Sequence, residues 1–257
     1  MRSKWTAGLL ALTLALSLTA CTSGAPTTAT PGGGTAPTPK PLKKVSLVLD
    51  WYPNADQIPL FVAQKEGYFK AEGIDLEIKM PAENPTDGIK LVGGGKETFA
   101  FYYQPDVLQA RGEGIPVVSV AAVVRQPLNV LMASEGTGIN SPKDLEGKTV
   151  GYPTTALSLD LVKTMVKTAG GDPAKVKFQD VGWDLIPAIT SKKVPAIIGG
   201  YVNHEKLLLE KEGQKVKAFK PTDFGVPSYY ELVLITGEQT VTKDPELVNA
   251  FVRAMGK

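Results

Sequence analysis

The sequence predicts an α/β fold of two lobes, each a mostly parallel sheet covered by helices. Over residues 45–255, short apolar runs typical of buried strands alternate with segments of helical periodicity, and such alternation favours a parallel sheet. The pattern repeats in two halves of similar style. Together these halves have enough chain for two lobes of about 100 residues each.

The first half of this region predicts four strands and three helices. The strands are expected at 45–49, 74–78, 99–101 and 117–124, and the helices at 58–69, 87–92 and 105–111. Gly73 is expected to end the first helical stretch.

The second half repeats this style and carries clear boundary signals. Strands are expected at 149–151, 196–198, 216–219 and 231–235, and helices at 157–169, 185–191, 203–212 and 245–255. Ser141 and Pro142 form a good N-cap and first turn, while Gly170 and Gly171 close the helix that precedes them.

The first 21 residues predict a lipoprotein signal peptide. Arg2 and Lys4 precede an apolar run over 9–18, which is shorter than the ~20 residues that a membrane-spanning helix needs. The run ends in Leu-Thr-Ala-Cys and resembles a lipobox, in which Cys21 becomes the lipidated first residue. An ordinary signal peptide that contains a cysteine is the alternative. Residues 22–42 are rich in Thr, Pro and Gly without aromatic residues, so we expect a disordered tether.

Charge and residue inventory exclude several functions. The net charge is +2 without a basic stripe, so nucleic acid is not an expected partner. Cys21 is the only cysteine, and once it is lipidated neither a disulfide nor a cysteine-based metal site is possible. His204 is the only histidine; beside Glu205 on a helix, it is expected to face away from it at the surface. We therefore expect no metal site, no cofactor and no nucleophilic triad.

Candidate ligand contacts follow the predicted strands, because α/β lobes bind ligands beyond the carboxyl ends of their strands. A flat ring needs aromatic faces for stacking and polar groups in the ring plane. The candidate stacking and loop residues are Trp51, Tyr103, Tyr152, Thr155, Tyr201 and Tyr230. The candidate carboxylate acceptors and amides are Asp50, Asp106, Glu205, Asn54 and Asn203.

Several of these residues have a structural alternative. Trp51 can pack between elements, and Asp50 and Asp106 can cap helices. Tyr201 and Glu205 are spaced i and i+4 across a helix start, so they are expected to share one face; the alternative for Glu205 is a solvated surface carboxylate. Of the two tyrosines before the last strand, at most one is expected to face a ligand.

Segments at these positions resemble a known family. The matching segments are Leu49-Asp50-Trp51-Tyr52-Pro53-Asn54, Gly67-Tyr68-Phe69-Lys70, Tyr103-Gln104-Pro105-Asp106, Gly147-Lys148-Thr149-Val150-Gly151-Tyr152-Pro153, Ile198-Gly199-Gly200-Tyr201-Val202-Asn203 and Tyr229-Tyr230-Glu231-Leu232. In number and order they are similar to the binding proteins for thiamine pyrimidine precursors, in the family shared with sulfonate-binding proteins and fungal pyrimidine synthases.

The resemblance implies a two-lobed, periplasmic-binding-protein-like fold of type II. Two crossovers between the lobes are then expected near 126–132 and 227–234. Lobe 1 would comprise 43–127, lobe 2 would comprise 128–228, and 229–257 would return to lobe 1. Family members usually continue with further helices, so the resemblance also implies that this chain is truncated.

The resemblance further implies an extracytoplasmic, lipid-anchored, monomeric solute-binding protein. It would deliver an aminopyrimidine, formylaminopyrimidine or hydroxymethylpyrimidine, to the permease and ATPase subunits of an ABC importer. A flavin, sulfonate or nitrate is the alternative ligand, although the strand-end segments contain no Arg and several carboxylates. A pyrimidine synthase-like enzyme is less favoured: those enzymes carry a Cys-rich iron-binding stretch and a reactive His, whereas Asp106 or a neighbour stands about where that His would be.

Overall fold

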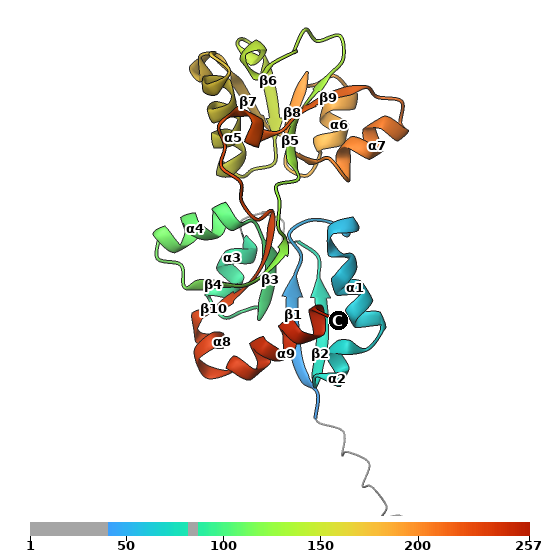
Figure 1. Cartoon of the computed structure of the whole chain (residues 1–257), viewed down its shortest axis with the longest axis vertical. Coiled ribbons are helices and arrows are strands. Elements are labelled where there is room, and N and C mark those ends of the chain that lie inside the picture. The colour runs from blue at the N-terminus through green and yellow to red at the C-terminus, as the bar shows by residue number, and fades with distance from the viewer. Residues whose placement is uncertain (1–40, 82–86) are drawn as a thin grey trace, which may run out of the picture. The chain divides into compact units, whose positions relative to one another are not determined.

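The computed structural model describes residues 41–81 and 87–257 (Figure 1). The predicted signal peptide, the predicted lipidation site Cys21 and nearly all of the predicted tether lie outside the described residues. Within the described ranges, no helix combines the length and the apolar character that crossing a bilayer requires.

The first lobe is built on a five-stranded sheet of order β2-β1-β3-β10-β4. Its strands are β1 (Lys43–Val48), β2 (Ile74–Lys79), β3 (Phe99–Tyr102), β4 (Val117–Val124) and β10 (Leu232–Gly237). β1 pairs in parallel with β2 and β3, whereas β10 runs antiparallel to β3 and β4.

Helices cover both faces of this sheet, because its central strands carry apolar side chains on both faces. Val45 and Leu47 point to one core cluster and Val48 to the other. The first cluster is covered by α1 (Ile58–Lys65), α2 (Tyr68–Ala71) and α9 (Pro245–Met255), and the second by α3 (Asp87–Gly93) and α4 (Gln104–Gly112). α8 (Glu238–Lys243) joins β10 to α9.

The second lobe is built on a sheet of order β7-β6-β8-β5-β9. Its strands are β5 (Asn129–Ser134), β6 (Thr149–Tyr152), β7 (Lys177–Asp180), β8 (Ala196–Tyr201) and β9 (Val216–Phe219). α5 (Ala156–Thr168) packs on one core cluster, while α6 (Leu185–Thr190) and α7 (Glu205–Lys211) pack on the other.

As predicted, most strands of each sheet run in one direction. Each sheet is mixed only because the strand that follows each crossover, β5 or β10, enters its sheet antiparallel to both neighbours. One expectation needs correction, because the helix predicted over 58–69 is interrupted. Gly67 adopts a left-handed conformation with φ of 76°, which ends α1 and lets α2 begin in a new direction.

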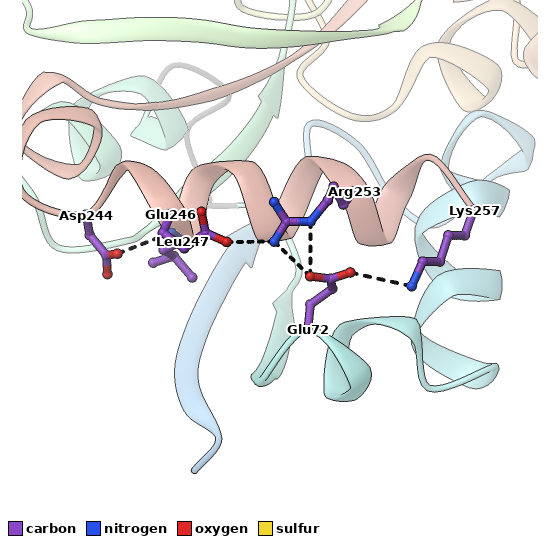
Figure 2. Close-up of polar contacts among 6 residues, drawn as sticks. All are labelled: Glu72, Asp244, Glu246, Leu247, Arg253 and Lys257. Carbon is purple, nitrogen blue, oxygen red and sulfur yellow. Dashed lines mark hydrogen bonds and ion pairs between the residues drawn. The ribbon is translucent and has the colours of Figure 1, made fainter. Parts of the chain in front are cut away.

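α9 is attached to the first lobe by aromatic packing and by an ion-pair network. The ring of the fully buried Phe251 lies 4.8 Å from that of Phe69 and 4.2 Å from that of Phe99, measured between centroids. Figure 2 shows the polar side of the same contact, where Glu72 beyond α2 accepts hydrogen bonds from Arg253 at 2.9 and 3.2 Å and from Lys257 at 3.4 Å.

Figure 2 also shows two contacts within α9 and its N-terminal cap. Arg253 also donates to Glu246 at 2.7 Å, and the side chain of Asp244 caps α9 by accepting from the backbone N of Leu247 at 3.2 Å. Exposed ion pairs contribute ~0–1 kcal/mol each, so the buried aromatic contacts are the larger contribution to the docking of α9.

We therefore expect Phe251→Ala to lower the free energy of unfolding by about 3–5 kcal/mol, because it opens a cavity between three packed rings. Chemical denaturation followed by circular dichroism measures this quantity. The matched control is Asn249→Ala on the exposed side of the same helix, for which we expect a change within about 0.5 kcal/mol. Equal effects of the two substitutions would show that α9 is not anchored through Phe251.

Candidate functional site

A small cavity lies where strand ends of the two lobes meet. It is lined by Trp51, Tyr103, Asn129, Pro153, Thr155, Leu157, Ser158, Gly199, Tyr201 and Glu231. Its free volume is about 20 Å³, which is room for about one water molecule. A larger hollow of about 530 Å³ runs along β1 and β2, but none of the described residues that line it is aromatic. The small cavity is therefore the better candidate for a ring-binding site.

Aromatic side chains from both lobes meet beside this cavity. Trp51 follows β1 in the first lobe, yet it packs against the second-lobe core and places its ring 4.4 Å from that of Trp183, edge to face. The ring of Tyr52 lies 5.6 Å from the same Trp183. Trp183 was not among the predicted site residues; it follows β7, a strand that the sequence pattern did not reveal.

Three tyrosine side chains converge on the carboxyl groups of the site. Burial and then the Asp50 charge hold the pKa of the Tyr103 hydroxyl well above its ordinary value. Burial and then the Glu231 charge raise the pKa of Tyr201 in the same way. The hydroxyls of Tyr201 and Tyr229 are buried. The Tyr201 hydroxyl interacts with the carboxyl group of Glu231, which opposes the larger effect of burial on the pKa of Glu231. The Tyr229 hydroxyl has no hydrogen-bond partner among the described residues, so it is available to a ligand.

Asp50 lies just after β1 and is buried. Its Oδ1 accepts a hydrogen bond from Nε2 of the buried Gln57 at 2.9 Å, while its Oδ2 has no partner among the described residues. Burial disfavours the charged form and raises the pKa of Asp50 to about 6.

Glu231 is the main site residue that sequence reasoning missed. It immediately precedes β10 and is 1% exposed, and its Oε2 accepts from the backbone N of Leu128 at 2.6 Å and of Asn129 at 2.9 Å. Burial raises its pKa to about 7. The neighbouring Tyr230, which was predicted instead, is 42% exposed and outside the cavity lining.

The surroundings of Glu205 differ from the expectation. Tyr201 is the last residue of β8 and α7 begins only at Glu205, so the two residues do not share a helix face. Glu205 is 5% exposed, and its Oε2 accepts from the backbone N of Tyr201 at 2.8 Å. Its Oε1 lies 2.8 Å from Nδ1 of His204. His204 thus turns toward Glu205, because it precedes the helix, and this contact raises its pKa.

The two predicted amides are engaged in protein contacts. Asn54 caps the 3-10 helix Ala55–Gln57 by accepting from the backbone N of Asp56 at 2.8 Å. Asn203, in the turn after β8, donates from Nδ2 to Oδ1 of Asp56 at 2.7 Å, which joins the second lobe to the first.

In the second lobe, Thr155 lines the cavity, whereas Tyr152 is not among the lining residues. Thr155 is buried and its hydroxyl shares a hydrogen bond with that of Ser158 at 2.8 Å. Tyr152 packs edge to face on Phe178, with 6.2 Å between ring centroids. Gly199 lines the cavity with φ of 103°, and a Cβ there would come within 2.6 Å of Pro153, so only glycine permits this close approach.

Asp106 faces a different space. It lines a hollow of about 230 Å³ between α3 and α4, together with Ile89, Tyr102 and Ile115. Its Oδ2 is buried without a partner among the described residues, and burial raises its pKa to about 7. Of the predicted residues, the cavity therefore gathers Trp51, Tyr103, Thr155 and Tyr201. Among the described residues no cluster of three or more His, Cys, Asp and Glu side chains is arranged to hold a metal ion.

The raised pKa of Asp106 predicts a pH-dependent stability. A carboxyl with a higher pKa in the folded than in the unfolded protein contributes most stability below the unfolded pKa of ~3.9 and loses that contribution as pH rises to about 7. The loss amounts to at most ~1.4 kcal/mol per pH unit.

We expect Asp106→Asn to remove this slope and to be more stable than the parent protein at pH 8, but not at pH 4. Denaturant midpoints measured across this range test the expectation. Asp75→Asn on the exposed face of β2 is the control, and an equal response of both variants would contradict a special environment for Asp106.

The chain is similar in sequence to known proteins over most of its length. One relative is a formylaminopyrimidine-binding protein of Halalkalibacterium halodurans, which is 47% identical over 86% of this chain and 66% of its own length. Another is a 4-amino-5-hydroxymethyl-2-methylpyrimidine phosphate synthase of Legionella pneumophila, which is 31% identical over 82% of this chain and 66% of its own length. The chain thus spans about two thirds of the length of these relatives.

The fold matches solved solute-binding proteins. The periplasmic aliphatic sulphonate binding protein SsuA of Escherichia coli superposes with a TM-score of 0.65 and 13% identity, over 83% of this chain and 71% of that one. Its fold is the two-lobed periplasmic-binding-protein fold that the sequence predicted. A sequence profile described as NMT1/THI5 like matches residues 54–257. The chain belongs to the NMT1/THI5-like family.

Proposed function

We propose that this chain is the extracytoplasmic solute-binding protein of an ABC-type importer and that it binds a thiamine pyrimidine precursor. The observation that carries the proposal is the cavity between the lobes, where Trp51, Tyr103 and Tyr201 supply aromatic faces and Glu231 supplies a carboxyl group. The 47% identity to a formylaminopyrimidine-binding protein supports the same ligand class.

The chemistry of the cavity suits a flat ring that bears an amine. Aromatic faces stack on such a ring, and a carboxyl group accepts a hydrogen bond from its exocyclic amine. Because the pKa of Glu231 is about 7, its carboxyl group can take either form. When protonated it can donate a hydrogen bond to a ring nitrogen, and when ionised it can accept one from an amine. A free volume of about 20 Å³ is too small for a pyrimidine ring, so the lobes must open for entry and the lining side chains must repack around the ligand.

The alternatives find less support in the same cavity. An anion such as a sulfonate would call for Arg, Lys or a helix N-terminus. The N-terminus of α5 does line the cavity, but the described lining residues include neither Arg nor Lys, and the carboxyl group of Glu231 disfavours an anion there. An enzyme of the synthase type is disfavoured because residues 41–257 contain no Cys and the single His204 is engaged by Glu205 away from the cavity lining.

Binding of a pyrimidine can be tested by calorimetric titration. We expect formylaminopyrimidine or hydroxymethylpyrimidine to bind with a Kd of about 1 μM or lower, ~ −8 kcal/mol. Trp51→Ala should weaken binding at least about tenfold, because a stacked aromatic face is worth ~1–3 kcal/mol. Leu108→Ala, on the exposed side of α4, is the control. Tight binding of an alkanesulfonate without any response to pyrimidines would overturn the proposal.

The lipid anchor is a separate part of the proposal and rests on the Leu-Thr-Ala-Cys sequence that ends at Cys21. We expect Cys21→Ser to move the protein from the membrane fraction to the soluble fraction, while its circular dichroism spectrum stays unchanged. Fractionation followed by immunoblotting provides the measurement. Retention of the Cys21→Ser protein on membranes after a high-salt wash would exclude lipidation at this residue.

A further inference from the structure

One hydrogen bond joins the two lobes outside the cavity lining. Nδ2 of Asn203 donates to Oδ1 of Asp56 at 2.7 Å, although the two residues are 147 positions apart in the chain. Asp56 belongs to the 3-10 helix between β1 and α1, and Asn203 belongs to the turn between β8 and α7. Each residue lies just beyond the carboxyl end of a strand that leads to the cavity.

On the first lobe, hydrogen bonds link Asp56 to the site. Asn54 accepts from the backbone N of Asp56 at 2.8 Å, and its own backbone N donates to Oε1 of Gln57 at 2.9 Å. This capping box fixes the 3-10 helix that carries Asp56. Nε2 of the same Gln57 donates to Oδ1 of Asp50 at 2.9 Å. These hydrogen bonds connect Asp50 to the segment that carries Asp56.

On the second lobe, a matching set of contacts links Asn203 to the cavity. The next two residues in the chain, His204 and Glu205, are paired through Nδ1 and Oε1 at 2.8 Å. Glu205 also accepts from the backbone N of Tyr201 at 2.8 Å, and Tyr201 lines the cavity. The turn that presents Asn203 is thus fixed by the strand end that would contact the ligand.

The contact lies among groups of both charge signs. Burial raises the pKa of Asp56, and its carboxyl group is attracted to His204 across the lobe boundary and repelled by Glu205. In addition, Oδ2 of Asp56 and Oδ1 of Asn203 are buried without a partner among the described residues, and both atoms would regain water if the lobes separated. A contact with one strong hydrogen bond and two unsatisfied atoms can form and break easily.

We propose that Asp56 and Asn203 form an inter-lobe latch that favours the closed conformation and that is coupled to ligand occupancy through Asp50 and Tyr201. The coupling to occupancy rests on the proposed binding function, whereas the latch itself acts without ligand. The two residues are positioning residues rather than ligand contacts, because neither lines the cavity.

The test measures lobe separation in the absence of ligand. In the full chain carrying Cys21→Ser, Glu66→Cys and Glu212→Cys introduce labelling sites for a fluorescence energy-transfer pair at the exposed ends of α1 and α7. Asn203→Ala and Asp56→Ala should each lower the transfer efficiency, and the double variant should lower it no further than either single one. Asp56→Asn, which keeps an acceptor oxygen, should restore most of the efficiency.

A second readout tests the coupling. The Asn203→Ala protein should bind hydroxymethylpyrimidine about tenfold more weakly than the parent, which corresponds to ~1.4 kcal/mol. Asn249→Ala on the exposed side of α9 is the control for both readouts. If the proposed ligand is wrong, no variant will bind the pyrimidine, but the transfer efficiencies will still separate the latch variants from the control.

Specific results would overturn the proposal. The latch is refuted if the transfer efficiency of Asn203→Ala equals that of the parent, or if the two alanine substitutions have additive effects. Tighter pyrimidine binding by Asn203→Ala would refute closure over the ligand. Asn203→Ala leaves the Asn54–Gln57 capping box intact, so it decides the question even if circular dichroism shows that Asp56→Ala does not fold.

Discussion

The carboxyl group of Glu231 joins the two chain connections between the lobes at the wall of the cavity. It lies on the second crossover, directly before β10, and accepts hydrogen bonds from two backbone N–H groups at the end of the first crossover, Leu128 and Asn129. The carbonyl of Leu128 in turn accepts from Val202 beyond β8. Both connections between the lobes are therefore joined at the cavity wall.

The same region contains buried polar atoms without partners. Oδ2 of Asp50 and the hydroxyl of Tyr229 make no hydrogen bond with the described residues, and each such atom costs ~1–3 kcal/mol when it is buried. Native structures tolerate few of these atoms. These unpartnered atoms lower the free energy of unfolding. A ligand with donors and acceptors in its ring plane could satisfy them, so their position beside the cavity fits a binding site.

The mixed sheets explain which parts could be predicted from the sequence. The strands 117–124 and 216–219 and the helix 245–255 have the predicted boundaries, since their apolar periodicity is regular. β5 was missed because its apolar run was assigned to a crossover. β7 was missed because Lys177–Asp180 is a short, largely polar strand at the edge of its sheet, where one side of the strand needs no apolar neighbours.

The predicted site was incomplete for the same reason. Trp51, Tyr103 and Tyr201 follow or end parallel strands, and the carboxyl ends of such strands are where ligand contacts are expected. An antiparallel strand, however, brings its amino end to that same edge of the sheet. Asn129 begins β5 and Glu231 precedes β10, so both reach the cavity from the starts of antiparallel strands. Once the two crossover strands are known to be antiparallel, their first residues become the natural candidates.

The energetics of closure follow from these contacts. A hydrogen bond to a charged group contributes ~1.5–3 kcal/mol, whereas each of the two unsatisfied buried atoms costs ~1–3 kcal/mol, so the contact between Asp56 and Asn203 favours closure by ~1 kcal/mol at most. Contacts between Trp51 and Trp183 add apolar burial on the side of closure. A binding protein needs closure to be only weakly favoured without ligand. If closure were strongly favoured, the open state that admits the ligand would be rare, and the apparent affinity would fall in proportion to the fraction of open protein. Because the contacts between the lobes are weak, ligand binding in the cavity can shift the equilibrium from the open to the closed conformation.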